Sequence, residues 1–599
     1  MSTRYYLTFG APPPDPDDGG GPARRRPTPK RRLLVLFIIM VGVSLVLMGQ
    51  LVRHQVFGVA PVTPVRKLPE KLRLRGAVVD THGHPLAIQT FRYEVIASPN
   101  AMKPENMPAI AGKVAAYLNR SPEELLSIFR ANEKSPYVLL EKNVPAQVGE
   151  AILSDDELQL NGIGVDVYPE RYHPEGNLAA HLLGFVDVDN KGHYGIEEYF
   201  NNFLLAPTDE IVPGPDPRLE KSLGAPAADA VLPESPFIPS PARRDLILTL
   251  SRSLQFVAET RLQEAIEAYQ AESGVVIIMD PQTSAVLAMA GYPSYNPDRY
   301  ADYAPERFIN PAISKIYEPG SVFKLITFAA ALDKQAITPD MRFKDTDKFI
   351  YGEQTIRNWD RKGRGMVTAQ QALAESLNVT TARIATREVG ATDFYNTVAR
   401  FGFGQNTGIE LAFEAAGIVN GPTSPQWAIG NLATNSFGQG ISVTPLQMAN
   451  AVAAIAAGGV VHRPHIVNMS INEDVVRVKE PEGASIAISP EAARTLTQMM
   501  VAAANHTKKA IVPGYAIAGK TGTAEIPTMG GYKEDRTITT FVGFFPADDP
   551  QFLILVKLER PKTSAWASQT AAPTFRKIAE DIIHIYNLPP DDIRLQTSP

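Results

Sequence analysis

The chain has 599 residues, of which 44% are apolar, a formal net charge of −6 and no cysteine. This length predicts two or three domains, and the apolar content is that of a globular protein with sizeable cores. Mild acidity, without a basic stripe interleaved with aromatic residues, argues against nucleic acid as a partner. The lack of cysteine excludes disulfides, thiolate metal sites and thiol catalysis.

The N-terminal segment predicts a membrane anchor. Residues 1–32 form a Pro-, Gly- and Asp-rich tail that ends in a basic cluster, and residues 33–52 are apolar and uncharged. About 20 such residues suffice to span a bilayer, and flanking positive charge stays in the cytoplasm. A cleaved signal peptide is the alternative, but no small-x-small cleavage site follows. We therefore expect a single-pass anchor with a disordered cytoplasmic tail and an exported remainder.

Residues 54–205 read as an α+β lobe. Short β-like runs occupy 76–98, and a helix is expected to begin with Ser121 as N-cap, Pro122 in the first turn and Glu124 completing a capping box. Residues 206–243 are dense in proline and lack apolar periodicity, so they predict either a linker or a long surface loop.

Residues 244–590 predict a larger α+β domain. An amphipathic helix over 253–269 precedes a β-hairpin over 274–290, and strands are expected over 516–525, 537–546 and 551–559. Between them, helices are expected at 321–333, 367–388, 391–402, 444–457 and 489–504. A last helix, 570–588, would present Phe575, Ile578, Ile582 and Tyr586 on one face. This order predicts an antiparallel sheet built from both ends of the domain, flanked by helices as an α/β sandwich, with a helical lobe between.

Ser321 and Lys324 are the first candidate catalytic pair. The Pro319-Gly320 break places Ser321 at a helix start, and Lys324 follows three residues later on the same face. A neutral lysine can take the proton of a serine nucleophile, provided that burial or a second cation lowers its pKa. The alternative is an N-cap serine beside a solvated lysine. Ser-x-x-Lys occurs only here in the chain.

Two further motifs are weaker evidence for a catalytic site when each is taken alone. Ser376-Leu377-Asn378 lies in the predicted helical lobe, where a polar helix-end pair is the simpler interpretation. Lys520-Thr521-Gly522-Thr523 lies on a predicted strand, where a cation and two hydroxyls suit a substrate carboxylate and Gly522 allows close backbone approach. A turn with a solvated lysine is the alternative for this second motif.

Taken in order, the three motifs resemble the signature of penicillin-binding proteins and class A β-lactamases, with Leu377 where that signature has Asp. The chain resembles a class B penicillin-binding protein, a peptidoglycan D,D-transpeptidase, more the division (septal) type than the elongation type. The stretches that carry the likeness lie at 75–80, 168–200, 293–297, 318–324, 436–459 and 518–525.

The resemblance implies the roles of the first two motifs. Ser321 would be acylated by the penultimate D-Ala of a stem peptide, with Lys324 as general base. Ser376 would pass a proton to the leaving amine, and Asn378 would orient Lys324 and the substrate amide. β-Lactams would acylate Ser321 irreversibly.

The third motif would hold the substrate. Lys520 would keep Ser376 in place and Lys324 neutral, Thr521 and Thr523 would bind the terminal carboxylate, and Gly522 would allow the ligand backbone to approach. The backbone N–H groups of Ser321 and Thr523 would form an oxyanion hole.

The resemblance also implies a setting and partners. These are the bacterial inner membrane, a pedestal or dimerisation-like domain at 54–205, stem peptides on glycan derived from lipid II, a polytopic glycosyltransferase of the shape, elongation, division and sporulation family, and divisome or elongasome proteins. No cofactor is implied, and the ten histidines show no metal-binding pattern.

Three alternatives remain open. The chain could be an elongation-type transpeptidase, a carboxypeptidase or β-lactamase of the same fold, or a non-enzymatic β-lactam sensor or scaffold. The expected anchor and N-terminal lobe argue against the hydrolases, which need neither.

Overall fold

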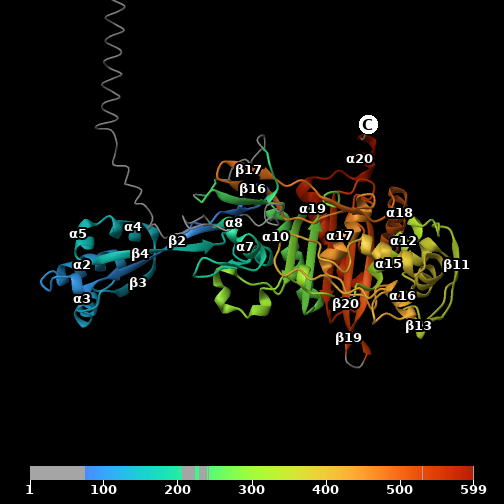
Figure 1. The fold of residues 1–599 in the computed structure, drawn as a ribbon, viewed down its shortest axis with the longest axis horizontal. Coiled ribbons are helices and arrows are strands. Elements are labelled where there is room, and N and C mark those ends of the chain that lie inside the picture. Colours follow the sequence, from blue (N-terminus) through green and yellow to red (C-terminus); the bar gives the residue numbers. More distant parts are fainter. Residues whose placement is uncertain (1–73, 206–222, 228–238, 241, 529–530, 598–599) are drawn as a thin grey trace, which may run out of the picture. The chain divides into compact units, whose positions relative to one another are not determined.

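The computed structural model describes residues 74–205, 223–227, 239–240, 242–528 and 531–597 (Figure 1). The expected tail, the expected anchor at 33–52 and most of the proline-rich stretch lie outside the described residues. Within the described ranges, no helix combines the length and the apolar character needed to cross a membrane.

The stretch up to residue 205 contains an α+β lobe around strand β2, which pairs antiparallel with β3 and β4. Helix α3 begins as expected, with Ser121 accepting a hydrogen bond from the Glu124 N–H at 3.3 Å. The capping box is incomplete, because the Glu124 carboxylate pairs with Arg120 instead. The elements are β1 (Val78–Val79), β2 (Pro85–Ala97), α2 (Met107–Leu118), α3 (Pro122–Ala131), β3 (Val138–Val144), α4 (Ala146–Leu153), α5 (Asp156–Leu160), β4 (Ile163–Tyr172), α6 (Ala180–Leu183), β5 (Phe185–Val186), β6 (Gly192–His193), α7 (Gly195–Tyr199) and α8 (Asn201–Leu204).

One sheet joins this region to segments far along the chain. Its strand order is β3-β2-β1-β8-β16-β17-β7, with β4 also on β2, and β1 runs parallel to β8. The distant strands are β7 (Ala225–Pro226), β8 (Arg244–Leu248), β16 (Val467–Asn472) and β17 (Val475–Val478). Gly76 allows the junction, because a Cβ there would lie 1.8 Å from the Arg244 carbonyl oxygen.

The second sheet is the predicted one, antiparallel throughout with the order β10-β9-β21-β20-β19. The two early strands, β10 and β9, lie side by side, and they join the three late strands where β21 pairs with β9. Helices α10, α18 and α19 flank it, and α19 buries Phe575, Ile578 and Ile582 while Tyr586 stays 41% exposed. The elements are α10 (Arg252–Tyr269), β9 (Ser273–Met279), β10 (Val286–Tyr292), α18 (Pro490–Thr507), β19 (Ala518–Thr528), β20 (Gly531–Phe545), β21 (Phe552–Glu559), α19 (Ala571–Tyr586) and α20 (Asp591–Thr597).

The helical lobe lies between the two halves of this sheet in sequence. The expected helix at 367–388 is broken: α13 ends before Ser376, α14 begins after it, and the chain continues as a π-helix, η6. The elements are η3 (Pro297–Asp302), η4 (Pro305–Arg307), α11 (Pro311–Ser314), η5 (Gly320–Phe323), α12 (Lys324–Asp333), β11 (Arg342–Asp345), β12 (Phe349–Tyr351), β13 (Gln354–Ile356), β14 (Gly365–Thr368), α13 (Ala369–Ala374), α14 (Asn378–Arg383), η6 (Ile384–Val389), α15 (Ala391–Arg400), α16 (Ile429–Asn435), α17 (Pro445–Ala456), β15 (Val460–His462) and β18 (Gly483–Ile486).

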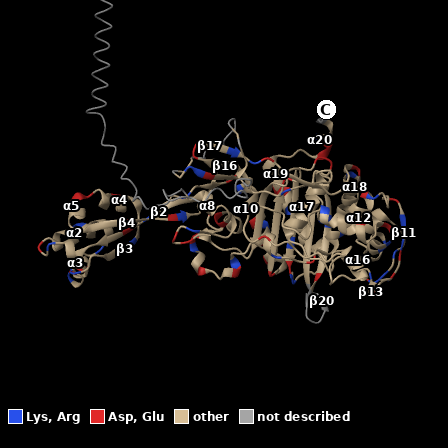
Figure 2. Cartoon of the chain, in the orientation of Figure 1, with Lys and Arg blue, Asp and Glu red and all other residues tan. Residues whose placement is uncertain are grey.

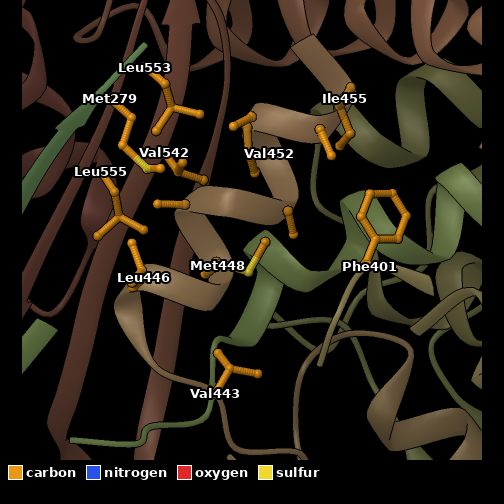
Figure 3. Packing of buried hydrophobic residues seen from close by; sticks show 14 of the residues in the cluster. Met279, Phe401, Val443, Leu446, Met448, Val452, Ile455, Val542, Leu553 and Leu555 are labelled. Atoms are coloured by element: carbon orange, nitrogen blue, oxygen red, sulfur yellow. The ribbon is translucent and has the colours of Figure 1, made fainter. Parts of the chain in front are cut away.

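Helix α17 joins sheet and lobe into one core. It carries no charged residue, and nearly all of it is buried, while charges of both signs are scattered over the surrounding elements (Figure 2). Figure 3 shows its side chains between the sheet and the segment after α15; the labelled residues are Met279, Phe401, Val443, Leu446, Met448, Val452, Ile455, Val542, Leu553 and Leu555. This packing fixes the sheet against the lobe, and the candidate site lies between them.

Candidate active site

Ser321 lies in the short 3-10 turn η5, directly before α12. Gly320 takes φ +55°, and its amide donates to the Gly438 carbonyl at 3.1 Å, so the turn rests on the "SFGQG" loop. A Cβ on Gly438 would lie 2.3 Å from the Gly320 carbonyl oxygen, which explains the glycine there. The turn is thereby held rigidly, with the Ser321 side chain partly exposed.

Lys324 is the first residue of α12, and its side chain is fully buried. Its Nζ donates to the Ser376 carbonyl oxygen at 2.5 Å and lies 3.0 Å from Ser376 Oγ. Among the described residues, Ser321 Oγ makes no hydrogen bond, so the amine contacts Ser376 and not the predicted nucleophile. Ser321 and Lys324 are three residues apart as expected, but the hydrogen bonds of Lys324 Nζ go to Ser376.

Ser376 is held in the left-handed region, with φ +59°, between α13 and α14. Its amide bonds back to the Leu373 carbonyl and that of Leu377 to the Ala372 carbonyl, which is a Schellman-type helix end with serine in the position that usually takes glycine. A non-glycine residue in this region costs on the order of 1 kcal/mol and often marks a functional site. The break in the predicted helix is what presents Ser376 to Lys324.

Lys520 reaches the same hydroxyl from strand β19. Its Nζ lies 3.0 Å from Ser376 Oγ and donates to the Thr521 carbonyl at 3.0 Å. Burial lowers the pKa of Lys520 from 10.5 to about 7. Burial also lowers the pKa of Lys324 well below its ordinary value, and the positive charge of Lys520 lowers it further.

Two buried amines therefore flank one hydroxyl, and they cannot both keep a proton at low cost. A charged Lys520 donates to Ser376 Oγ, whose proton can then point to the lone pair of a neutral Lys324. This arrangement supplies a base and a path for its proton. It can deprotonate an alcohol and protonate a leaving amine.

The remaining residues of the third motif line the strand beside the serine turn. A Cβ on Gly522 would lie 3.0 Å from the Pro319 carbonyl oxygen and 3.0 Å from Val322 Cγ1. The glycine that we expected to admit a ligand backbone thus admits the nucleophile turn itself. Thr523 Oγ1 accepts from the Ala567 N–H at 3.2 Å, and Thr521 Oγ1 lies 3.5 Å from Lys520 Nζ.

Asn378 and Leu377 differ from what the resemblance implies. Asn378 Nδ2 donates to the Arg357 carbonyl at 3.0 Å, and no hydrogen bond joins it to Lys324 within the described residues. It ties α14 to the loop over 357–364. Leu377 is fully buried in the main core, so the middle position of this motif serves packing.

Sequence reasoning did not identify Asp345, which ends β11 and is 2% exposed. Its negative charge acts on Lys324 in the opposite direction to Lys520 and raises the Lys324 pKa. Asp345 follows Lys324 by 21 residues, a spacing that matches no motif, so no signal in the sequence marked it.

Two known family models match most of the residues that the structure describes. A model described as the penicillin binding protein transpeptidase domain matches residues 274–580, and one described as the penicillin-binding protein dimerisation domain matches 73–205. The chain belongs to the class B penicillin-binding proteins. Its eight predicted site residues all lie within the transpeptidase match.

Relatives of this class B penicillin-binding protein cover most of its length. Stage V sporulation protein D of Bacillus subtilis is 30% identical over 522 residues, which are 85% of this chain and 77% of the relative. The peptidoglycan D,D-transpeptidase FtsI of Escherichia coli is 28% identical over 86% of this chain and 84% of its own.

Solved structures of penicillin-binding proteins have folds similar to that of this chain. Penicillin binding protein 3 of Mycobacterium tuberculosis is 25% identical, with a TM-score of 0.64 over 86% of this chain and 97% of that one. It has also been solved in complex with aztreonam and with ampicillin.

Proposed function

We propose that this penicillin-binding protein is a peptidoglycan D,D-transpeptidase that crosslinks stem peptides through an acyl-enzyme on Ser321, in septal wall synthesis. The observation that carries the proposal is the pair of buried lysines, Lys324 and Lys520, on either side of Ser376 Oγ and next to the Ser321 turn. The relatives named as peptidoglycan D,D-transpeptidases support the reaction and substrate.

In the first half-reaction, Ser321 Oγ attacks the carbonyl carbon of the penultimate D-Ala. A C–O bond forms, the C–N bond to the terminal D-Ala breaks, and that D-Ala leaves. The Ser321 proton passes to neutral Lys324 and, through Ser376, to the leaving nitrogen, so protons balance. Lys520 stays charged and stabilises the negative charge that develops at the site.

In the second half-reaction, an amine of a neighbouring stem peptide attacks the acyl carbon. The new C–N bond forms the crosslink, the C–O bond to Ser321 breaks, and the amine proton returns to Ser321 along the same path. A β-lactam follows the first half only: its ring C–N bond opens, but the leaving nitrogen remains tethered to the acyl group.

Thr521 and Thr523 are proposed to bind the terminal carboxylate beside Lys520. The support is the position of both threonines on β19, next to the turn that carries Ser321. The Asn378 amide is proposed to contact the substrate amide, since its Nδ2 donates to the Arg357 carbonyl and no hydrogen bond joins it to Lys324 among the described residues.

The cellular setting is part of the proposal. The apolar stretch 33–52 behind a basic cluster supports a single-pass inner-membrane anchor with the catalytic domain outside the cytoplasm. The division of the chain at 205/206 and 243/244 is supported by the dense proline and the lack of apolar periodicity between these boundaries. A polytopic glycosyltransferase and other division proteins are the partners that family membership implies. The septal role is supported by the likeness of 356–379 and 436–447 to division-type sequences.

Covalent labelling tests the reaction. Purified full-length protein is incubated with a fluorescent penicillin, and the adduct is located by peptide mass spectrometry. We expect one adduct, on Ser321, and none in Ser321→Ala. An adduct elsewhere, or labelling that survives the substitution, would refute the proposal, and an acyl-enzyme lifetime of seconds would indicate a hydrolase.

Depletion of the protein in cells tests the subtype, because filaments indicate a division role and round cells indicate an elongation role.

A further inference from the structure

Asp345 is a buried carboxylate to which the mechanism above gives no role. It accepts hydrogen bonds from Thr380 Oγ1 at 2.8 Å, Asn358 Nδ2 at 2.8 Å and the Arg364 N–H at 3.0 Å. All three partners act as donors, which is the hydrogen-bond pattern of an ionised carboxylate. Burying such a charge is costly unless nearby groups compensate for it, so its neighbours are informative.

The hydrogen bonds of Asp345 converge on the first turn of α14. Thr380 belongs to that turn, and Asn358 Oδ1 accepts from the Val379 N–H at 3.1 Å. The carboxylate thus holds the turn directly through Thr380 and indirectly through Asn358. Because Ser376 precedes the turn by two residues and has an unfavourable φ of +59°, its position depends on this anchor.

The charges around Asp345 come from several elements. Lys324 on α12 and Arg383 at the end of α14 both interact electrostatically with it. The Arg364 guanidinium turns away, to Asp360 at 2.8 Å and Glu375 at 3.1 Å. Lys520 on β19 and Asp345 on β11 therefore act on Lys324 with opposite sign.

We propose that Asp345 is a positioning residue of the acylation reaction, which fixes the turn after Ser376 and supplies a negative charge that opposes the positive charge of Lys520 at Lys324. The inference rests on the proposed function, in which Lys324 accepts the Ser321 proton as a neutral amine. Without Asp345, Lys324 would lose its proton at lower pH. The acid limb of the pH profile for acylation would then move to lower pH.

The test separates the effect of the negative charge of Asp345 from the effect of its hydrogen bond to Thr380. The second-order rate of Ser321 acylation by a fluorescent penicillin is measured between about pH 5 and 10 for full-length wild type, Asp345→Asn, Asp345→Glu and Thr380→Val. For Asp345→Asn we expect the acid limb to move to lower pH by at most about one unit, because Asp345 is the weakest of the three influences on the Lys324 pKa. The amide fits, because its NH2 can donate to a rotated Thr380 hydroxyl.

The control variants separate the two roles. Asp345→Glu keeps the charge, so its acid limb should stay at the wild-type pH. Thr380→Val keeps the charge and loses one hydrogen bond, so its rate should fall by about threefold to tenfold with the limb unmoved. Asp345→Ser serves as a second neutral variant if Asp345→Asn does not fold.

An acid limb that stays in place, or moves to higher pH, in the neutral variants would overturn the proposal. So would identical profiles for Asp345→Asn and Thr380→Val, which would indicate a structural role alone. A wild type that is not acylated on Ser321 would refute the proposed function instead, so the two failures are distinguishable.

Discussion

Lys520 illustrates the cost in stability of burying an amine. In the folded protein its pKa is about 7, against 10.5 for an ordinary lysine. Between these values the unfolded chain holds a proton that the folded chain has lost, so the free energy of unfolding rises with pH. Below about pH 7 the folded protein bears the full cost of the buried cation.

We therefore predict that Lys520→Met, although inactive, unfolds at a higher temperature than wild type near about pH 6, by a few degrees. The difference should narrow as the pH approaches about 10.5. Thermal unfolding monitored by circular dichroism between about pH 6 and 10.5 measures the difference in unfolding temperature and its narrowing with pH. Lys334→Met, at a half-exposed position paired with Asp393, is the control and should show no such pH-dependent gap. A gap that widens with pH would contradict the prediction.

Leu377 occupies the position at which the family signature has an acidic residue. Here the side chain is fully buried in the main core, between Ser376 and Asn378. We predict that Leu377→Asp destabilises the protein by about 3 kcal/mol or more, because it replaces a packed leucine with a buried carboxylate. Denaturant unfolding measures the loss. Leu377→Met, of similar volume, should cost less than about 1.5 kcal/mol, and equal stability of the two variants would show that the position is open to water.

At the scale of elements, strand β19 packs closely against the serine turn. A side chain at Gly522 would meet Pro319 and Val322 at 3.0 Å, closer than ordinary packing allows. We predict that Gly522→Ala pushes the turn from the strand, slows acylation by about tenfold and costs about 1–3 kcal/mol of stability. Stopped-flow acylation and thermal unfolding measure the two effects.

Gly112 provides the matched control for this substitution. It lies in α2, where a Cβ would have no atom within 4 Å. Gly112→Ala should leave acylation unchanged and add about 0.5–1 kcal/mol of stability, because alanine is the better helix former. An acylation rate that is unaffected in Gly522→Ala would mean that the turn and strand move independently.

The elements themselves were largely predictable, because most carry local signals. The hairpin at 274–290, the three late strands and the last helix follow from apolar periodicity and turn residues, and the structure confirms them. The break at Ser376 was not predictable, since no glycine or proline marks it and the strain is supported by tertiary contacts. For the same reason the sequence located Lys324 and Lys520 but not Asp345, whose role depends on long-range contacts.

At the scale of the molecule, a buried Arg–Glu–Arg triad joins distant parts of the stretch 74–205. Glu197, fully buried, pairs with Arg75 at 2.5 Å and with Arg171 at 2.6 Å. Arg75 lies at the start of the stretch, Arg171 in β4 and Glu197 near the end of the stretch. One carboxylate therefore links the beginning and the end of the stretch to β4. Arg171 also donates to the Gly76 carbonyl, beside the strand pair β1–β8.

We predict that Glu197→Gln lowers the free energy of unfolding by about 3–5 kcal/mol, because it leaves two buried guanidinium groups without their anion. Thermal unfolding should show the loss, and the exposed Glu105→Gln should show none. In the part of the chain that the structure describes, no hydrogen bond or ion pair joins a triad member to Ser321, Lys324 or Ser376. Acylation well below the unfolding temperature should therefore stay within about twofold of wild type. If acylation were instead lost while the unfolding temperature held, the triad would have to act on the catalytic site through the shared sheet.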